Sequence, residues 1–485
     1  MSGLNGIGVA ISGGGYRASM WGLGALMYLV DAGAAKDVVS IASVSGGSIT
    51  NGVVAQQVPD LRTCTPDGFD AAMTPFVGRV ADVGLFPLAK PTRAYTLGLA
   101  ADTVLALAAT VGGFVTLVRG GWDAGTTWWA IVAAVLWAVA LWAFEQRSRV
   151  ADRALARTEF ATAGRPTLLA EVDRPTQHVF CATELQESHQ LYLSPRFVYS
   201  WAHGTGTPGD LRLSTAVQAS ACFPGGFRPR RLRATRFGFV RREGESGAAL
   251  QWVVLTDGGV YDNMSEQWLA TTSLRAPTPQ QGVQPGPMVQ TLLVVNASAL
   301  KPPKALPDGG PWGEVVDLLA TMDVMYGQTT SVRRYDLVAL WELRATAGKG
   351  QVGALVNIGQ DPLAAARGLA RHPSWAHTPA EQARVARAEK AVAALVDAGV
   401  DWAGLQEQNA SVGTVLSALG QGVSLRLVYG GYVTAVVNAF VLLDLPWVDI
   451  PEPDAFGRRV GLVAAGAVPR VAASASRAPV SPAGP

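Results

Sequence analysis

Short apolar runs and stretches of helical spacing alternate along the first part of the chain. Gly6–Ser12 and Val38–Val44 have the length and composition of buried strands. Each is followed by a glycine-containing turn, and after the first turn the apolar residues of Met20–Val30 recur at helical spacing. Two strand–helix units in series predict an α/β protein with a mostly parallel central sheet covered by helices. Ligands bind such sheets at the carboxyl ends of the strands, where both glycine turns fall.

The longest apolar stretches lie after these two units. Leu97–Val118 contains a single charge, Asp102, and Thr126–Phe144 contains none. Each is about as long as the roughly 20 residues that a helix needs to cross a bilayer. With the short connection Arg119–Gly125 they predict an inserted apolar helical hairpin. We expect the hairpin to span a membrane; the alternatives are a buried hairpin and a hydrophobic lid.

Aromatic and basic residues around this hairpin predict its orientation. Tryptophans gather near the connection, and Trp142 and Phe144 lie at the other end, as in the aromatic belts of membrane interfaces. Basic flanks favour the cytoplasmic side of a membrane. We therefore expect an inner-membrane or plasma-membrane protein whose sheet domain is cytoplasmic and whose hairpin loop lies outside. The flanking basic residues are Lys90, Arg93, Arg147, Arg149, Arg153 and Arg157.

Later segments complete the sheet and add helices. Leu292–Val295 and Leu355–Ile358 are further candidate strands, and Arg426–Leu443 favours a core helix over a third membrane span. The tail from Ala464 is rich in Ala, Ser and Pro and is predicted to be disordered. The expected organisation is a catalytic core in two parts, 1–90 and 151–300, an inserted hairpin, 91–150, a helical and strand extension, 301–463, and a disordered tail, 464–485.

Composition narrows the class of protein. Of the 485 residues 49% are hydrophobic and 16% are charged, whereas soluble domains average about 25% charged residues, so membrane contact is expected. A net charge of +2 creates no strong field, and no nucleic-acid partner is expected. The three cysteines lie far apart, so neither a zinc site nor a disulfide framework is indicated, and we expect no metal and no cofactor. The N-terminal segment does not resemble a secretory signal.

Gly13, Gly14 and Gly15 join the first strand to the first helix. Their amides can point at one spot, and the helix N-terminus adds positive potential, which suits an anion or a developing oxyanion. Arg17 is expected to support a phosphate or to brace the loop. A loose dinucleotide fingerprint and a purely structural turn remain alternatives. The fingerprint requires an acidic residue at the end of the second strand. In this chain the second strand ends in Ser45 instead.

The turn after the second strand predicts a nucleophile. In Ser43-Val44-Ser45-Gly46-Gly47 a serine stands at a sharp strand-to-helix junction among small residues, which is typical of a nucleophile elbow. Such an elbow exposes the serine hydroxyl, and small neighbours are needed because the backbone is crowded. Serine is also common in turns and helix caps, so Ser45 alone is equally compatible with a structural role.

A nucleophilic serine needs a base. None of the five histidines follows a clear strand in a glycine-framed turn. Asp257 is the better partner because it closes the apolar strand Trp252–Leu255 and precedes Gly258 and Gly259. This position predicts that Asp257 lies at the same edge of the sheet as Ser45. A carboxylate takes the serine proton if burial raises its pKa. The structural alternative is an Asx turn.

The chain resembles the patatin-like phospholipases and the related cytosolic phospholipase A group. The resemblance covers roughly residues 1–300 and depends first on three motifs in this order: Gly13-Gly14-Gly15-Tyr16-Arg17, Ser43–Gly47 and Asp257-Gly258-Gly259. Phe180–Leu185 is similar to a strand of the family, and Ala216–Phe227 is similar to its helix and proline turn.

This resemblance implies a three-layer α/β sandwich and a Ser–Asp dyad, Ser45 and Asp257, that works without histidine. It also implies that Gly13, Gly14 and Gly15 form the oxyanion hole. The chain departs from the family at Ala18, where a glycine often follows the arginine, and at Ser43, which replaces the first glycine of the elbow. Neither departure removes a reacting group.

We therefore expect a serine acyl hydrolase, a phospholipase or lipase, that cleaves fatty-acyl esters through an acyl-enzyme. Its expected partners are the lipid bilayer and a membrane phospholipid or acylglycerol substrate. Two other functions stay open at this point. One is a catalytically idle, membrane-associated scaffold or sensor, and the other is a nucleotide-binding enzyme, which is supported by the glycine loop alone.

Overall fold

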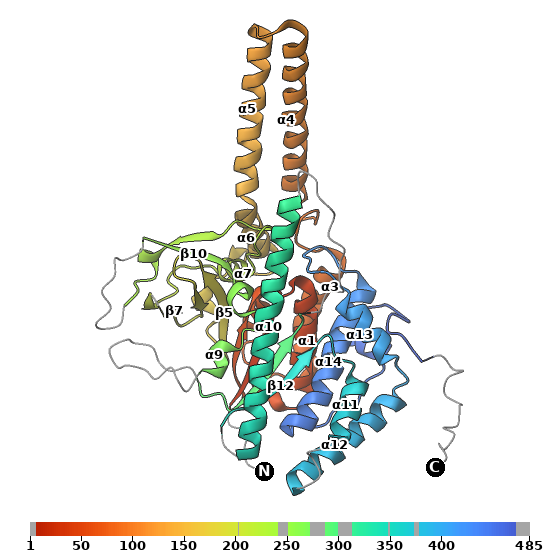
Figure 1. Ribbon diagram of the computed structural model, residues 1–485. Coiled ribbons are helices and arrows are strands. Elements are labelled where there is room, and N and C mark those ends of the chain that lie inside the picture. The colour runs from red at the N-terminus through yellow and green to blue at the C-terminus, as the bar shows by residue number, and fades with distance from the viewer. Residues whose placement is uncertain are drawn as a thin grey trace.

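A ten-stranded sheet forms the centre of the molecule (Figure 1). The computed structural model describes residues 6–201, 203–240, 251–271, 287–298, 313–347, 350–372 and 378–471. The strands follow one another across the sheet in the order β12, β11, β1, β2, β5, β6, β7 and β8. Their bounds are Val352–Asn357, Thr291–Asn296, Ile7–Ile11, Val38–Ser43, Gln177–Glu184, His189–Leu193, Val198–Ser200 and Gly204–Gly206.

The strands from β12 to β5 are parallel, and the remainder of the sheet is antiparallel. All four pairings from β12 to β5 run parallel. β6, β7 and β8 follow as antiparallel neighbours. β10 (Trp252–Asp257) pairs antiparallel with the C-terminal half of β5. β9 (Arg230–Arg233) pairs antiparallel with β10. The predicted α/β fold with a mostly parallel central sheet is confirmed. A separate two-stranded sheet consists of β3 (Ala161–Thr162) and β4 (Arg165–Pro166).

Helices cover both faces of the sheet, which gives the three expected layers. Alternate side chains of a strand point to opposite faces. Ile7, Val9 and Ile11 of β1 belong to the larger apolar cluster, whereas Ala10 packs in a second cluster with Trp268 and Leu337. The larger cluster includes side chains of α1 (Gly15–Asp31), α2 (Ser45–Gln57), α3 (Pro66–Asp82) and α14 (Gln421–Leu443). α9 (Gln267–Ala270) and α10 (Gly313–Ala347) cover the other face.

The helix α14 is part of the core, as the sequence predicted. Three described helices are long and apolar enough to cross a membrane, but 83% of the apolar window of α14 is buried inside the protein. α14 packs against α1 at glycines. A Cβ at Gly24 would lie 2.1 Å from the Val428 carbonyl oxygen, and one at Gly431 would lie 2.3 Å from the Trp21 carbonyl oxygen. The two backbones therefore approach closely, and α14 packs tightly within the sheet domain.

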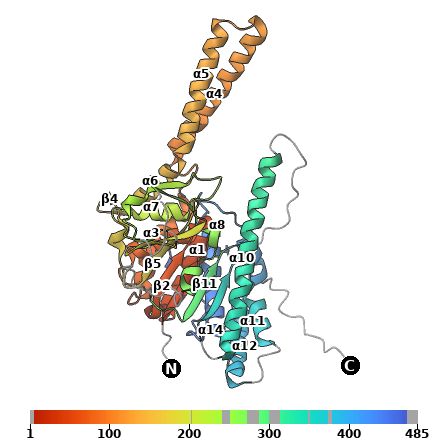
Figure 2. The same ribbon diagram turned by 60° about the vertical axis from the view of Figure 1, so that its left-hand side comes forward.

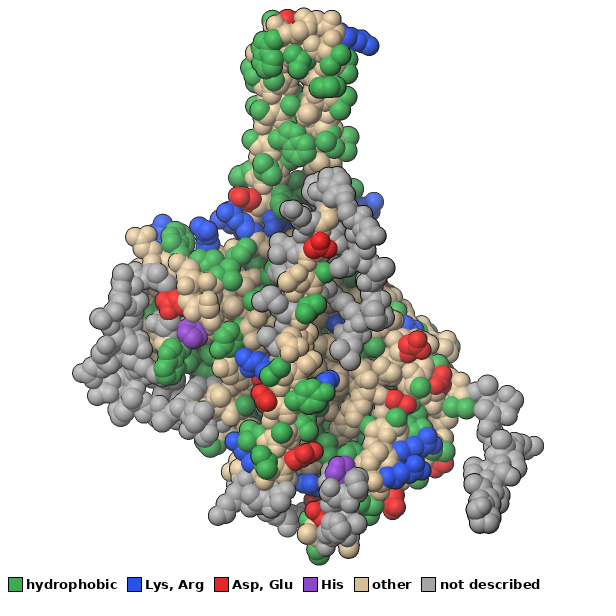
Figure 3. Space-filling view, in the orientation of Figure 1, with side chains coloured by type: hydrophobic (Ala, Val, Ile, Leu, Met, Phe, Trp, Pro, Cys, Tyr) green, Lys and Arg blue, Asp and Glu red, His purple; other side chains and the backbone are tan. Residues whose placement is uncertain are grey.

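The other two long apolar helices form a hairpin that projects from the body of the molecule (Figures 1 and 2). They are α4 (Arg93–Gly120) and α5 (Ala124–Glu145), and only 11% of the apolar window of each is buried. Their apolar side chains cover the surface of the projection (Figure 3). Gly112 and Gly113 leave room for Trp129 between the helices. The alternative of a hairpin buried in the protein core does not agree with this arrangement.

The remaining helices surround the sheet, and the end of the described chain packs against the connection between α12 (Pro379–Asp397) and α13 (Trp402–Ala410). Residues from Ala464 were expected to be disordered, but Val468 is buried and Arg470 forms a β-bridge with Val400. This packing corrects the prediction for 464–471, and residues 472–485 lie outside the described part. The other helices are α6 (Arg147–Thr158), α7 (Leu213–Ser220), α8 (Gly259–Asp262), α11 (Pro362–Ala370) and α15 (Pro453–Arg459).

Candidate active site

The glycine loop connects β1 to α1 at the carboxyl edge of the parallel strands. Gly14 has φ 139° and Gly15 has φ 58°. Residues with a side chain rarely adopt backbone conformations with positive φ. A Cβ at Gly15 would also lie 2.5 Å from the Val415 carbonyl oxygen. Both positions therefore require glycine, and the loop leaves its backbone uncovered by side chains of its own.

The three amides of this loop are not equivalent. The Gly13 amide donates to the Asn263 carbonyl oxygen at 3.0 Å, so it is already engaged. Within the described residues neither the Gly14 nor the Gly15 amide donates a hydrogen bond. The amide of Gly46 in the first turn of α2 is likewise free. The expectation that Gly13, Gly14 and Gly15 act alike thus changes, because Gly13 holds the loop while Gly14 and Gly15 keep their donors.

Ser45 occupies a strained turn between β2 and α2. Its φ is 51°, which is uncommon for a residue with a side chain and is found at functional turns. The following glycine brings the two loops together, since a Cβ at Gly46 would lie 1.9 Å from the Gly15 carbonyl oxygen. Ser45 is therefore held beside the glycine loop, as expected for two turns at the carboxyl ends of neighbouring parallel strands.

Ser43 has a structural role that explains the departure from the family pattern. Its hydroxyl lies 3.0 Å from the Ser48 hydroxyl and accepts a hydrogen bond from the Asn51 side chain at 2.9 Å. Ser48 in turn lies 2.8 Å from the hydroxyl of Ser220. This buried hydroxyl chain ties the end of β2 to α2 and α7, which fixes the elbow from behind.

Ser220 is a positioning residue that sequence reasoning missed. Its hydroxyl accepts a hydrogen bond from the Ser45 amide at 3.2 Å and donates one to the Cys181 carbonyl oxygen at 2.6 Å. Its carbonyl oxygen accepts from the Gly258 amide at 3.1 Å. Ser220 thus connects the elbow to the strand end that carries Asp257. The segment Ala216–Phe227 had been recognised as family-like, but no local signal distinguished this serine.

Asp257 lies at the end of β10 and is 3% exposed. Its amide donates to the Cys222 carbonyl oxygen at 3.0 Å, and its Oδ1 accepts from the Gly259 amide at 2.8 Å. The second carboxyl oxygen, Oδ2, makes no hydrogen bond within the described residues. Burial raises the pKa of Asp257 to about 6, against the lowering effects of the Gly259 amide and the Ser45 hydroxyl.

Ser45 and Asp257 are neighbours. The Ser45 hydroxyl interacts with the Asp257 carboxyl and lowers its pKa, while Oδ2 has no hydrogen bond of standard geometry among the described residues. Loose contacts of this kind are common in unliganded sites and tighten when substrate binds. The arrangement places a nucleophile beside a carboxyl group that has one oxygen without another partner in the described part of the chain.

Arg17 braces the glycine loop. It is 8% exposed, and its Nη1 donates to the Val412 carbonyl oxygen. The Tyr16 amide donates to the Val415 carbonyl oxygen at 2.9 Å, so the same late segment is held at a second point. Of the two expected roles of Arg17, phosphate support and loop bracing, these contacts favour bracing.

Two buried histidines, His178 and His203, do not compete with Asp257 as a base. His178 is buried, and its Nδ1 lies 2.7 Å from the Asn51 side-chain oxygen. Burial lowers the pKa of His178 to about 3, so it stays neutral and supports α2. His203 is buried and stacks on Phe239. Within the described residues no three His, Cys, Asp or Glu side chains converge as metal ligands.

The position of the serine turn agrees with one class of protein. A strained serine at the carboxyl end of a central parallel strand, beside free backbone amides, is typical of α/β acyl hydrolases. A family model for patatin-like phospholipase matches residues 9–267, more than half of the chain. The chain belongs to the patatin-like phospholipase family.

The chain is also similar to solved structures with which it shares little sequence. It is similar to human GIVD cytosolic phospholipase A2 in complex with methyl gamma-linolenyl fluorophosphonate and terbium chloride, with 11% identity, a TM-score of 0.41 and coverage of 94% of this chain and 59% of the human one. VipD from Legionella pneumophila shows 13% identity, a TM-score of 0.25 and coverage of 88% and 74%. The chain thus spans about 59% of the human enzyme's length. No curated protein matches it.

Proposed function

We propose that this protein is a membrane-tethered serine acyl hydrolase that cleaves fatty-acyl esters of membrane phospholipid or acylglycerol with Ser45 and Asp257. One observation carries the proposal: a serine at φ 51° lies beside a buried carboxyl whose Oδ2 has no other partner among the described residues. Strain at Ser45 is costly for folding, and such strain persists where function needs it.

The reaction follows from these positions. The Ser45 hydroxyl transfers its proton to Oδ2 of Asp257 while its oxygen bonds to the ester carbonyl carbon. The resulting oxyanion accepts hydrogen bonds from the free amides of Gly14 and Gly15, with the N-terminus of α1 adding positive potential. The carbon–oxygen bond to the alcohol then breaks, and Asp257 returns the proton to that alcohol. Water attacks the acyl-enzyme by the same route and releases the fatty acid.

Apolar contacts support a site that faces a membrane. Cys222, whose carbonyl oxygen holds the Asp257 amide, packs with Phe227 and with Ala151 of α6. α6 begins directly after the projecting hairpin. The site is thereby linked to the base of α4 and α5, whose exposed apolar surface fits a bilayer and not water. The basic flanks of the hairpin favour a cytoplasmic catalytic domain.

Labelling with a fluorophosphonate probe tests the catalytic assignment. We expect the wild type to be labelled, Ser45→Ala not to be labelled, and Asp257→Asn to react about 100-fold or more slowly because the base is lost. Ser188→Ala is the matched control, since Ser188 also has a positive φ of 55° but lies exposed in the β5–β6 turn. Labelling of a correctly folded Ser45→Ala protein at the wild-type rate would refute the nucleophile, and an unlabelled wild type would favour the idle scaffold or sensor.

A further inference from the structure

A pocket lies at the base of the hairpin, apart from Ser45 and Asp257. Its cavity volume is about 470 Å³, within the range of small-molecule sites. Residues from three segments line it: the end of α3, the chain before α4, and α6. Those that matter are Val83, Lys90, Val150, Arg153, Ala154 and Arg157.

The three cations of this pocket have no partner among the described residues. Arg153 and Arg157 are exposed, and they are four residues apart on α6, so they share one face of the helix. Lys90 is exposed as well and comes from the opposite segment. None of the three forms a hydrogen bond or ion pair with another described residue, whereas neighbouring arginines such as Arg212 and Arg230 are paired.

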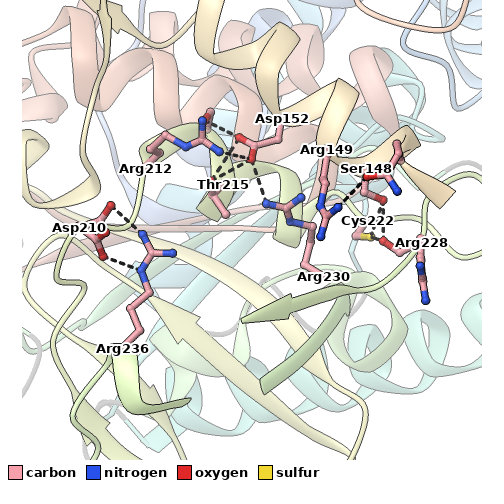
Figure 4. Close-up of polar contacts among 12 residues, drawn as sticks. Ser148, Arg149, Asp152, Asp210, Arg212, Thr215, Cys222, Arg228, Arg230 and Arg236 are labelled. Atoms are coloured by element: carbon pink, nitrogen blue, oxygen red, sulfur yellow. Dashed lines mark hydrogen bonds and ion pairs between the residues drawn. The ribbon is translucent and has the colours of Figure 1, made fainter. Parts of the chain in front are cut away.

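The acids on the surrounding elements are engaged by groups other than the three cations of the pocket. Asp152 on α6 lies between Arg212, at 2.8 Å, and Arg230, at 3.0 Å, and also accepts from Thr215 (Figure 4). Glu159, the residue after α6, pairs with Arg79 at 2.7 Å. Asp82 on α3 keeps its charge but accepts from the neutral Gln421 side chain at 2.8 and 2.9 Å. The three cations therefore outnumber the one nearby acid that lacks a cationic partner, and the pocket keeps a net positive charge.

The pocket also has an apolar part and a fixed position. Val83, Val150 and Ala154 line it beside the cations. A single residue, Gln146, separates α5 from α6. The pocket on α6 therefore lies just below the apolar helices of the hairpin. Figure 3 shows Lys and Arg side chains gathered around the foot of the hairpin. If the hairpin spans a bilayer, this is the depth of the lipid head groups.

We infer that Lys90, Arg153 and Arg157 form a binding site for the phosphate of an anionic phospholipid in the leaflet next to the catalytic domain. The apolar residues then contact the glycerol and the first acyl carbons. Basic pockets on the cytoplasmic side of membrane helices bind anionic head groups in this manner. The inference depends on the proposed membrane placement and is independent of the chemistry at Ser45. Such a site fixes the height of the catalytic domain over the bilayer.

Titration of the full-length, detergent-purified protein with phospholipid, followed by native mass spectrometry, tests the site. The Ser45→Ala background prevents any turnover of the probe and separates this test from the proposed hydrolase activity. We expect phosphatidylglycerol to bind more tightly than phosphatidylcholine. Arg153→Gln/Arg157→Gln should weaken phosphatidylglycerol binding about tenfold or more, since each cation near a head group contributes about fivefold.

The matched control is Arg367→Gln/Arg371→Gln. Arg367 and Arg371 are also exposed and four residues apart, but they belong to α11 and its C-cap, which lie far from the hairpin in Figure 1. The control should bind phosphatidylglycerol like its parent. If the α6 double variant unfolds, Lys90→Gln in the preceding loop provides a second test and should weaken binding about threefold to fivefold.

Three results would overturn the inference. Equal binding of phosphatidylglycerol by the parent, the α6 variant and Lys90→Gln would show that these cations are not the site. Equal binding of the two lipids by the parent would show that charge is not recognised. Displacement of the lipid by inorganic phosphate at micromolar concentration would identify a site for a soluble anion. Each result leaves the fluorophosphonate outcome at Ser45 unchanged, so failure of the pocket and failure of the hydrolase are distinguishable.

Discussion

Burial keeps the carboxyl of Asp257 protonated up to an unusually high pH. Its pKa rises from an ordinary value of 3.8 to about 6 in the folded protein. Between these values the folded state binds more protons than the unfolded state, so the stability contributed by this group is greatest below about pH 4 and falls as the pH rises through 6. Ionisation of Asp257 also creates the base. The rate of Ser45 labelling is therefore expected to rise over the same pH range in which the free energy of unfolding falls.

Asp257→Asn therefore separates stability from function. At pH 8 we expect its free energy of unfolding to exceed that of the wild type by about 2–3 kcal/mol, because the variant need not bury a charge, while fluorophosphonate labelling is slowed about 100-fold or more. At pH 4 the difference in stability should nearly vanish. Thermal unfolding in detergent at both pH values measures it.

Asp152→Asn is the control for this prediction. Asp152 is equally buried, but its carboxylate is paired with Arg212 and Arg230. Its loss leaves Arg230 uncompensated and should lower the unfolding temperature. A wild type whose stability and labelling rate both stay constant between pH 4 and 8 would contradict the role given to the burial of Asp257.

At the scale of elements, the contact between α1 and α14 supports the glycine loop. The loop begins α1, and the packing of α14 at Gly24 and Gly431 fixes that helix against the sheet. Arg17 and Tyr16 then bind the segment that leads into α14. The position of the free amides thus depends on a helix that lies some 400 residues later in the sequence.

Gly24→Ala tests this close approach. The added methyl group would lie 2.1 Å from the Val428 carbonyl oxygen, and we expect a loss of about 1–3 kcal/mol in stability together with slower labelling of Ser45. Gly78→Ala in α3 is the matched change, since nothing lies within 4 Å of its added methyl group. It should raise stability by about 0.5–1 kcal/mol, as alanine does in a helix. Equal effects of the two variants would argue against the contact.

At the scale of the whole molecule, the proposed location of the protein depends on the hairpin. Apolar side chains cover α4 and α5, and the sheet domain lies entirely at one end of them (Figure 1). If the hairpin spans, the loop around Trp122 and the sheet domain face opposite compartments. Cys64, near the start of α3, and Trp122, 71% exposed at the tip, report on the two ends.

Impermeant maleimide applied to right-side-out membrane vesicles tests this topology. We expect Trp122→Cys to be labelled in sealed vesicles and native Cys64 to be labelled only after permeabilisation. Cys181 and Cys222 are buried and should stay unlabelled in the folded protein. The chain should also remain with the membrane in alkaline carbonate. Labelling of both positions in sealed vesicles, or release by carbonate, would contradict a spanning hairpin.

The local sequence was sufficient where a feature is made by adjacent residues. The glycine turns, the strands β1 and β2, and the two helices of the hairpin each carry their signal within one short segment, because backbone conformation and apolar periodicity are local properties. The pairing of Ser45 with Asp257 was predicted from the strand end at Asp257 and from the resemblance of three motifs. The strand argument assumed a parallel strand, whereas β10 runs antiparallel to β5.

The tertiary structure decided everything that depends on partners distant in the chain. It engaged the Gly13 amide with Asn263, made Arg17 a brace through Val412, and gave Ser43 and Ser220 a shared role behind the elbow. It also buried α14 while leaving α4 and α5 exposed, although all three have the composition of membrane spans. Composition fixes how strongly a helix avoids water, but only packing determines whether protein or lipid replaces that water.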